Sequence, residues 1–499
     1  MAIVKVLGME TEYGIIIRGS ADPNPIAASS TLINAYVAEL SRRVGWDFED
    51  ETPGRDARGF AREGSMPPEV ETHLVNAVLT NGARYYVDHA HPEYSTPECA
   101  DVMDLIRYDK AGELILADSI AAAARLLPPG QSLVVLKNNS DGKGNSYGTH
   151  ENYLMDRAVP FSRIVANVMP HFVSRQVFTG AGKVGCEAPS GSRSDVAFQL
   201  TQRADFFEEE VGLETTLKRP IVNTRDEPHC DAHKYRRLHV IVGDANLSEV
   251  ANFLKAGTTA LVLSMIEDDW FAAANRDFTM QAPVAAMRRV SYDLSLAEPL
   301  ELADGRRMTA LEIQWEHLDL AKKYTEEVGF DSVGGPEVGY EILRRWEETL
   351  TALESDPMSL AEQLDWVAKY RLLNGYRERH GLSWQDPRLA AMDLQYHDVN
   401  PARSLHARLG TERLLDPEEV RRAVTEPPET TRAYFRGKCL QRWASAIAAA
   451  NWDSMVFDLG SDPLRRVPMM EPLRGTRAHV EELLCSVSSP AELLERLGS

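Results

Sequence analysis

Strand-like and helix-like segments alternate along this 499-residue chain at irregular intervals. Residues 83–88 and 133–137 are rich in aromatic, β-branched and aliphatic side chains, whereas residues 103–127 between them carry a long helical pattern. A parallel sheet requires repeated strand–helix–strand units, and the chain shows no such rhythm. The pattern therefore predicts an α+β fold with a largely antiparallel sheet.

Further elements follow from the same reasoning. A strand is expected at 3–18, with a kink at Gly8, and another at 236–244. Residues 30–44 have a helical pattern, and Ser248 is a typical N-cap for the helix expected after it.

Glycine, proline and charge mark the breaks between elements. Residues 45–72 are rich in all three and have no periodic apolar face, so we expect a long mobile loop there. Residues 336–425 are mostly helical, and the proline pair at 427–428 marks a boundary. We therefore predict a large domain over 1–426 and a small C-terminal domain over 427–499.

The composition disfavours several classes of protein. A net charge of −21 repels nucleic-acid phosphates, so DNA or RNA binding is not expected. No apolar run approaches the roughly 18–20 residues that cross a bilayer, and the N-terminus lacks a signal-peptide pattern. We therefore expect no membrane partner and a cytoplasmic location. The five cysteines are scattered, without a C-x-x-C pair, which disfavours a disulfide framework or a structural zinc site.

Glu10 and Glu12 stand two residues apart in the first predicted strand. Side chains alternate between the two faces of a strand, so both carboxylates point to the same side. They repel each other unless a cation or a basic group lies between them, and Mg²⁺ is a hard cation that takes oxygen ligands. Metal binding and a solvated acidic strand face explain this pair equally well.

A second polar face is predicted on the strand at 83–88. Arg84, Tyr86 and Asp88 share this face, and Glu93 follows just past a Pro turn. An Arg, a Tyr and two acids could together serve a phosphate, a metal and a proton transfer. Ordinary hydrogen bonding at a strand end is the alternative, and the His-Ala-His-Pro-Glu segment lacks the ligand spacing of a zinc site.

Two further segments carry candidate ligands. Residues 138–153 are polar and Gly-rich but lack the P-loop pattern, and His150 and Glu151 are candidate metal ligands there. On a later strand, Arg237 and His239 share a face and suit a phosphate and a metal respectively. A polar hairpin and surface ion pairs are the alternatives, and residue types alone do not decide between them.

A series of motifs, in this order, resembles the family of Pup ligases and Pup deamidases/depupylases, in which Pup is the prokaryotic ubiquitin-like protein. The motifs are GMETEYG, NGARYYVDHAHPEYSTPE, KNNSDGKGNSYGTHENYLM, NTRDEPH, YRRLHVIVGDAN, TRAYFRGKC, NWDSMVFDLG and EPLRG. That family shares its catalytic domain with glutamine synthetase and the glutamate–cysteine ligases. The resemblance implies a glutamine synthetase-like curved, largely antiparallel sheet with helices on its outer side, plus a small C-terminal domain.

The resemblance also implies cofactors and roles for individual residues. The cofactors are ATP and Mg²⁺. The implied metal shell consists of Glu10, Tyr86, Glu93, His150 and His239. The implied nucleotide contacts are Arg84, Thr96, Arg237 and Trp452. Asp88 is implied as the catalytic residue, acting as a nucleophile or as an acid/base.

The family has two branches that act in opposite directions. One joins the C-terminal glutamate of Pup to a substrate lysine with ATP, and the other deamidates the C-terminal glutamine of Pup and cleaves the Pup–lysine isopeptide bond. The spacing from Asp88 to Glu93, one residue shorter than in the ligases, and the loop at 45–72 near the site mouth both resemble the second branch. A Pup ligase and a non-catalytic nucleotide-binding regulator are the alternatives, and the retained Asp88 argues against the regulator.

The implied partners are Pup and pupylated proteins. Pup is acidic and largely disordered, so it would fold on binding to a basic groove. The residues expected to form this groove are Arg203, Lys218, Arg219 and Arg225.

Overall fold

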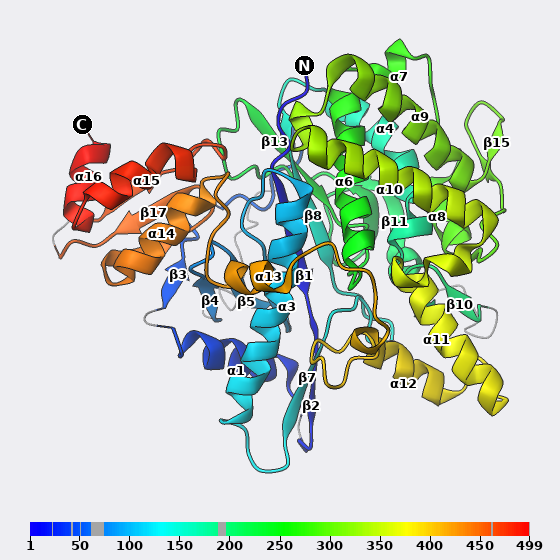
Figure 1. The fold of residues 1–499 in the computed structure, drawn as a ribbon, viewed down its shortest axis with the longest axis horizontal. Coiled ribbons are helices and arrows are strands. Elements are labelled where there is room, and N and C mark those ends of the chain that lie inside the picture. Colours follow the sequence, from blue (N-terminus) through cyan, green and yellow to red (C-terminus); the bar gives the residue numbers. More distant parts are fainter. Residues whose placement is uncertain are drawn as a thin grey trace.

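The computed structural model describes residues 1–21, 23–40, 43–49, 51–60, 74–187, 196–460 and 463–498. Its centre is a ten-stranded sheet (Figure 1). In spatial order the strands are β13 (Tyr235–Val240), β8 (Thr149–Asp156), β1 (Leu7–Glu12), β6 (His91–Ser95), β5 (Arg84–Asp88), β4 (Asn76–Val78), β3 (Val44–Trp46), β16 (Ile447–Ala450), β17 (Ser454–Phe457) and β18 (Arg465–Pro468). All neighbouring pairs are antiparallel except β3 and β16, which confirms the predicted α+β fold.

One face of this sheet is covered by two helices, α1 (Pro25–Val37) and α3 (Val102–Ala124), which pack against β1, β5 and β6. Tyr85 and Val87 point into this core, and the Tyr85 hydroxyl donates to Ser119 Oγ of α3 at 3.2 Å. Because side chains alternate along β5, its polar side chains face the other way. The face opposite these two helices therefore carries the residues expected in the site.

Most of the remaining helices form one side of the molecule (Figure 1). They are α4 (Phe161–Ser174), α5 (Gln176–Thr179), α6 (Glu249–Glu267), α7 (Trp270–Ala273), α8 (Pro283–Tyr292), α9 (Ala310–Val328), α10 (Pro336–Ser355), α11 (Asp365–His380) and α12 (Pro387–Tyr396). α13 (Pro417–Ala423) packs on α3. Ser248 caps α6 as predicted, because its side chain accepts from the Ala251 N–H. Among the described helices, none is both long and apolar enough to cross a membrane.

Four two-stranded sheets flank the main sheet. They pair β2 (Gly14–Arg18) with β7 (Ser132–Leu136), β9 (Lys183–Val184) with β10 (Phe198–Gln199), β11 (Phe207–Gly212) with β12 (Arg219–Asn223), and β14 (Leu300–Glu301) with β15 (Arg307–Met308). The pairing of β2 with β7 shows that the strand predicted at 3–18 is broken, but not at Gly8 as expected. Gly8 lies within β1 opposite Asn152, and the break falls at buried Tyr13, whose N–H donates to the Pro92 carbonyl at 2.9 Å. The chain breaks there because β2 leaves the main sheet to pair with β7.

The first helix starts and ends earlier than predicted. α1 begins at Pro25 because the Asn24 side chain accepts from the Ala27 N–H and proline fits the first helical position. It ends at Val37. Residue 44, predicted to end the helix, and residues 45–46, predicted to begin the loop, form β3 instead.

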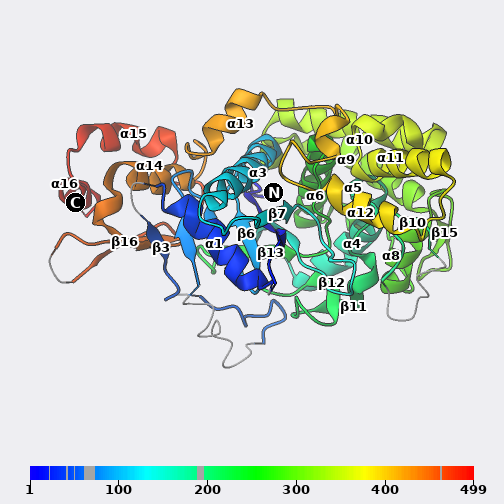
Figure 2. The same cartoon turned by 90° about the horizontal axis from the view of Figure 1, so that it is seen from below.

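The C-terminal segment lies at one end of the molecule (Figure 2). Its helices are α14 (Ala433–Trp443), α15 (Arg477–Ser486) and α16 (Pro490–Leu497). These helices share a hydrophobic cluster of their own with β16 and β17, which Trp46 and Val78 of the first half also join. The central sheet crosses the boundary at 426–427, because β16 pairs with β3. The division into domains over 1–426 and 427–499 stays a prediction.

The described parts of the predicted loop at 45–72 contact the segment before β13. The Thr224 hydroxyl donates to Asp56 Oδ2 at 2.8 Å, and the Ala57 N–H donates to the Thr224 carbonyl at 2.7 Å. Residues 50 and 61–72 of the loop lie outside the described residues. Its predicted mobility therefore stays a prediction.

Candidate active site

The face of the sheet opposite α1 and α3 brings Glu10, His150 and His239 together from β1, β8 and β13. Glu10 pairs directly with His150 across the strands, and the His150 Nδ1 lies 3.5 Å from Glu10 Oε2. The centroids of the two imidazole rings are 4.9 Å apart. One ligand atom from each of the three residues lies within 4.8 Å of the other two, which is a geometry suited to a single metal ion.

Asn152 sets the orientation of this cluster. Its Oδ1 accepts from His239 Nδ1 at 3.0 Å, and its Nδ2 donates to Glu10 Oε1 at 2.9 Å. The other ring nitrogen of His239, Nε2, is buried and has no hydrogen-bond partner among the described residues. Burial, with the charge of Arg237 adding to it, holds the pKa of His239 well below its usual range. A neutral imidazole with a free Nε2 lone pair is the form that binds a metal.

A second cluster, Glu12, Asp88 and Glu93, lies next to the first. Glu12 pairs with Glu93 between β1 and β6, and Tyr86 pairs with Glu93 between β5 and β6. The Tyr86 hydroxyl donates to the Glu93 carboxylate. One carboxylate oxygen from each of the three acids lies within 4.8 Å of the other two.

The pKa values of the acids in the two clusters shift in different directions. Burial would raise the pKa of Glu10, but the hydrogen bond from His150 and the charge of Arg237 outweigh burial and lower it. The pKa of Glu93 is raised well above its usual range, by burial first and then by repulsion from Asp88 and the neighbouring acids. A cation between the carboxylates would remove this repulsion. The donor set therefore fits a hard divalent ion.

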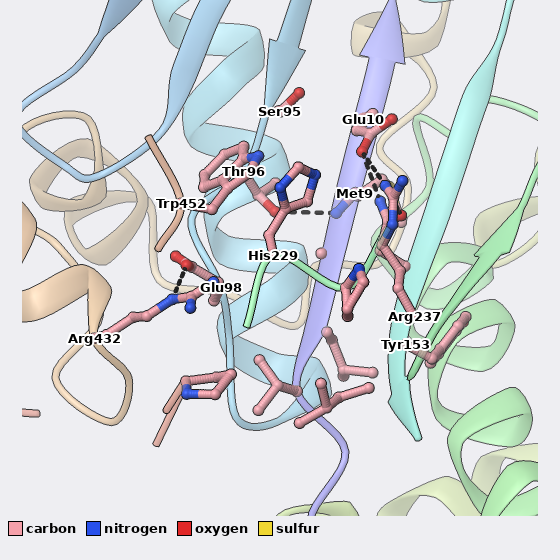
Figure 3. Close-up of a pocket in the computed structure, with 17 residues that line it drawn as sticks. Met9, Glu10, Ser95, Thr96, Glu98, Tyr153, His229, Arg237, Arg432 and Trp452 are labelled. Atoms are coloured by element: carbon pink, nitrogen blue, oxygen red, sulfur yellow. Dashed lines mark hydrogen bonds and ion pairs between the residues drawn. The ribbon is translucent and has the colours of Figure 1, made fainter. Parts of the chain in front are cut away.

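A pocket opens beside the first cluster (Figure 3). Thr96, Trp452 and His229 lie on one side of it, and Glu10 and Arg237 lie on the other (Figure 3). Apolar residues complete the wall: Val6, Leu154, Pro228 and Pro472. The pocket thus has a charged end beside the candidate metal site and an apolar end next to the Glu98–Arg432 ion pair.

Arg84 lies outside this lining but next to it. Its guanidinium carbon is 4.0 Å from the ring centroid of Trp46 and 3.9 Å from that of Tyr86. Trp46 in turn makes an edge contact with the pocket residue Trp452, with centroids 5.1 Å apart. The Arg84 charge is therefore held between two rings.

The four basic residues expected in a substrate groove differ in exposure. Arg203 is only 1% exposed and donates to the Ile241 carbonyl at 2.7 Å, whereas Lys218 is fully on the surface. Arg219 is half-buried and donates to the Ser146 carbonyl at 2.7 Å. Burial lowers the pKa of Arg203 to about 9, and the nearby Glu12 carboxylate acts against this shift. Arg225 is also half-buried, and its backbone pairs with that of Asp56. Their role in substrate binding stays a prediction.

Three sequence-based interpretations need correction or addition. Glu151 is not available to a metal, because it points to the opposite face of β8 and pairs with Arg175 at 2.6 Å. Glu93 lies within β6 rather than after a Pro turn, since the turn falls at His89 and Ala90. Asn152 was missed, although its position two residues after His150 places it on the same strand face.

Solved structures share this architecture. The Pup ligase PafA in complex with Pup has a TM-score of 0.80 and 31% sequence identity, covering 99% of this chain and 95% of that chain. PafA in complex with ADP has a TM-score of 0.74 and 35% identity, covering 89% and 96%. The fold is therefore glutamine synthetase-like, with a curved and mostly antiparallel sheet, as the resemblance implied.

Sequence comparisons lead to the same family. The family model of the Pup-ligase protein matches residues 5–456. A depupylase of Acidothermus cellulolyticus is 54% identical, and a Pup deamidase/depupylase of Mycolicibacterium smegmatis is 50% identical, each over 99% of both chains. A Pup–protein ligase of Pseudarthrobacter chlorophenolicus is 40% identical over 97% of this chain and 99% of its own. The chain belongs to the Pup-ligase protein family.

Proposed function

We propose that this chain is an ATP- and Mg²⁺-dependent amidohydrolase that deamidates the C-terminal glutamine of Pup and cleaves the Pup–lysine isopeptide bond. The relatives named for deamidation or depupylation are 50–54% identical, whereas the ligase from Pseudarthrobacter is 40% identical. The short spacing from Asp88 to Glu93 supports the same direction.

The observation that carries the proposal is the position of Asp88. It is the last residue of β5, its side chain is 27% exposed, and it lies within reach of Glu12 and Glu93. A carboxylate at a strand end, next to a candidate metal site and open to solvent, can meet both an amide and water. In the hydrolysis, water adds its oxygen to the carbonyl carbon, the C–N bond breaks, and the leaving amine takes a proton. Asp88 would attack the carbonyl or take the proton from the attacking water.

The residues around Asp88 fit the proposed cofactors. Glu10, His150 and His239 would hold a metal through the free Nε2 and the carboxylate, and Tyr86 would act through Glu93, to which it donates. When bound, Mg²⁺ supplies charge that polarises an oxygen and neutralises phosphate. The apolar end of the pocket would take the flat base of ATP beside Thr96 and Trp452, with Arg237 and Arg84 toward its phosphates.

The direction of the reaction is tested with purified protein, ATP, Mg²⁺ and Pup that ends in glutamine. We expect ammonia release, and release of intact protein from Pup conjugates, with far less than one ATP consumed per bond cleaved. Pup that ends in glutamate, mixed with a lysine-bearing protein, serves as the matched ligation reaction. New conjugates with one ATP used per bond, and no cleavage of existing conjugates, would instead assign the chain to the ligases.

A further inference from the structure

The chain reverses between β5 and β6 through only two residues, His89 and Ala90. Asp88 pairs with His91 across this turn, so Asp88 is the last paired residue of its strand. His89 has a φ of 50°, in the left-handed region that residues other than glycine adopt at a cost. The turn therefore keeps a strained residue directly beside the proposed catalytic carboxylate.

The His89 ring turns back toward that carboxylate. Its Nδ1 lies 2.8 Å from Asp88 Oδ2, and because an ionised carboxylate only accepts, Nδ1 is the donor. Glu12 and Glu93 each place a carboxylate oxygen within 4.8 Å of a carboxylate oxygen of Asp88, so the His89 ring is a hydrogen-bond donor in acidic surroundings. Across the turn, His91 Nδ1 lies 3.4 Å from Glu12 Oε2, which is a longer contact without hydrogen-bond geometry. The two histidines of the segment each face one acid of the cluster.

We propose that His89 is a positioning residue for Asp88. Its Nδ1–H holds Oδ2 and leaves Oδ1 as the oxygen that meets the substrate carbonyl or the attacking water. A glycine at this position would relieve the backbone strain but would remove the donor, so the presence of histidine favours the hydrogen bond over the relaxed turn. This inference rests on the proposed hydrolase function.

Three variants separate the hydrogen bond from the turn. His89→Gly relaxes the turn and loses the donor, His89→Ala keeps the strain and loses the donor, and His89→Asn tolerates the turn and keeps a donor on its amide. With glutamine-ended Pup, we expect kcat to fall about tenfold in the Gly and Ala variants. KM and nucleotide affinity should stay within about twofold, and the Asn variant should retain kcat within about threefold of wild type. Thermal unfolding should show His89→Gly at least as stable as wild type.

Two results would overturn the proposal. One is a His89→Gly variant with wild-type kcat, because the turn alone would then account for His89. The other comes from ¹⁵N-histidine NMR, which distinguishes the two ring nitrogens by which of them carries the proton. The ¹⁵N resonances of His89 are identified because they are absent from the spectrum of the His89→Asn variant. We expect them to show the proton on Nδ1, and a proton on Nε2 instead would exclude the hydrogen bond. If the wild-type protein released no ammonia, the hydrolase proposal would be wrong. The NMR measurement of the His89 tautomer would still show whether His89 donates to Asp88.

Discussion

The guanidinium of Arg436 in α14 donates to the carboxylate of Glu98, which follows β6, and its Nη1 lies 3.2 Å from Oε1. Arg432, one turn earlier, donates from Nε to the same carboxylate at 2.6 Å. Arg436 Nη1 also donates to the Trp452 carbonyl at 3.0 Å. Glu98 therefore links the C-terminal segment, and with it the pocket residue Trp452, to the central sheet.

Removal of this carboxylate should destabilise the protein strongly. Glu98→Ala leaves Arg432 and Arg436 buried without their anionic partner, so we expect the free energy of unfolding to fall by about 3–5 kcal/mol. Urea unfolding measures the change, with exposed Glu301→Ala as the control. A loss for Glu98→Ala no larger than that of the control would contradict the structural role of these ion pairs.

The same ion pairs predict how stability depends on acid. Burial would raise the pKa of Glu98, but the charges of Arg436 and Arg432 outweigh burial and lower it to about 2. The pKa of Glu98 in the folded protein thus lies below its value of about 4.3 in the unfolded chain. Ionised Glu98 therefore stabilises the fold fully above about pH 4.3, and this stabilisation is lost as the pH falls toward the folded pKa. The stability difference between wild type and Glu98→Gln should therefore be constant above about pH 5 and shrink below about pH 4. A difference that stays constant throughout this range would be inconsistent with the assignment.

Asp88→Asn should separate catalysis from binding. The amide is nearly isosteric with the carboxylate but neither attacks a carbonyl nor accepts a proton at neutral pH, so kcat should fall by about 10²–10⁴. Nucleotide affinity and thermal stability should remain close to wild type, because the Asp88 side chain is at the open end of β5. Asp304→Asn, in an exposed turn, is the matched control. Wild-type turnover in Asp88→Asn would remove this residue from the mechanism.

Glu10→Ala should weaken the binding of ATP with Mg²⁺. The change removes the anionic member of the Glu10, His150 and His239 cluster and the partner of Arg237. We expect a loss on the order of tenfold or more in affinity, measured by calorimetry with and without Mg²⁺. The loss should be greater with Mg²⁺ present. Unchanged affinity in both titrations would exclude Glu10 from the site.

Arg84→Lys should also weaken nucleotide binding, although the charge is kept. The planar guanidinium stacks between Trp46 and Tyr86, and a lysine ammonium cannot fill that space. We expect a several-fold loss of ATP affinity, with Arg18→Lys on the exposed end of β2 as the control. Equal affinity in the two variants would show that the stacked geometry of Arg84 does not matter.

Local periodicity alone predicted much of the candidate site. Alternation along a strand placed Glu10 with Glu12, and Arg84 with Tyr86 and Asp88, on shared faces, and the structure confirms both sets. The same rule, applied to the strand that carries His150, would have excluded Glu151 and found Asn152. These predictions hold because side-chain direction in a strand is set by the backbone of that strand.

The sequence determined the α+β class, the polar strand faces and, through its motifs, the family. Only the tertiary structure decided which strands are neighbours. β1 lies between β8 and β6, although the chain reaches β6 before β8, and this order brings Glu10 to His150 and Glu12 to Glu93. It also decided that Trp452 and Arg432, from the far end of the chain, complete a pocket built on β1. Strand pairing and the approach of distant segments depend on the burial of the whole core, which no local pattern of residues encodes.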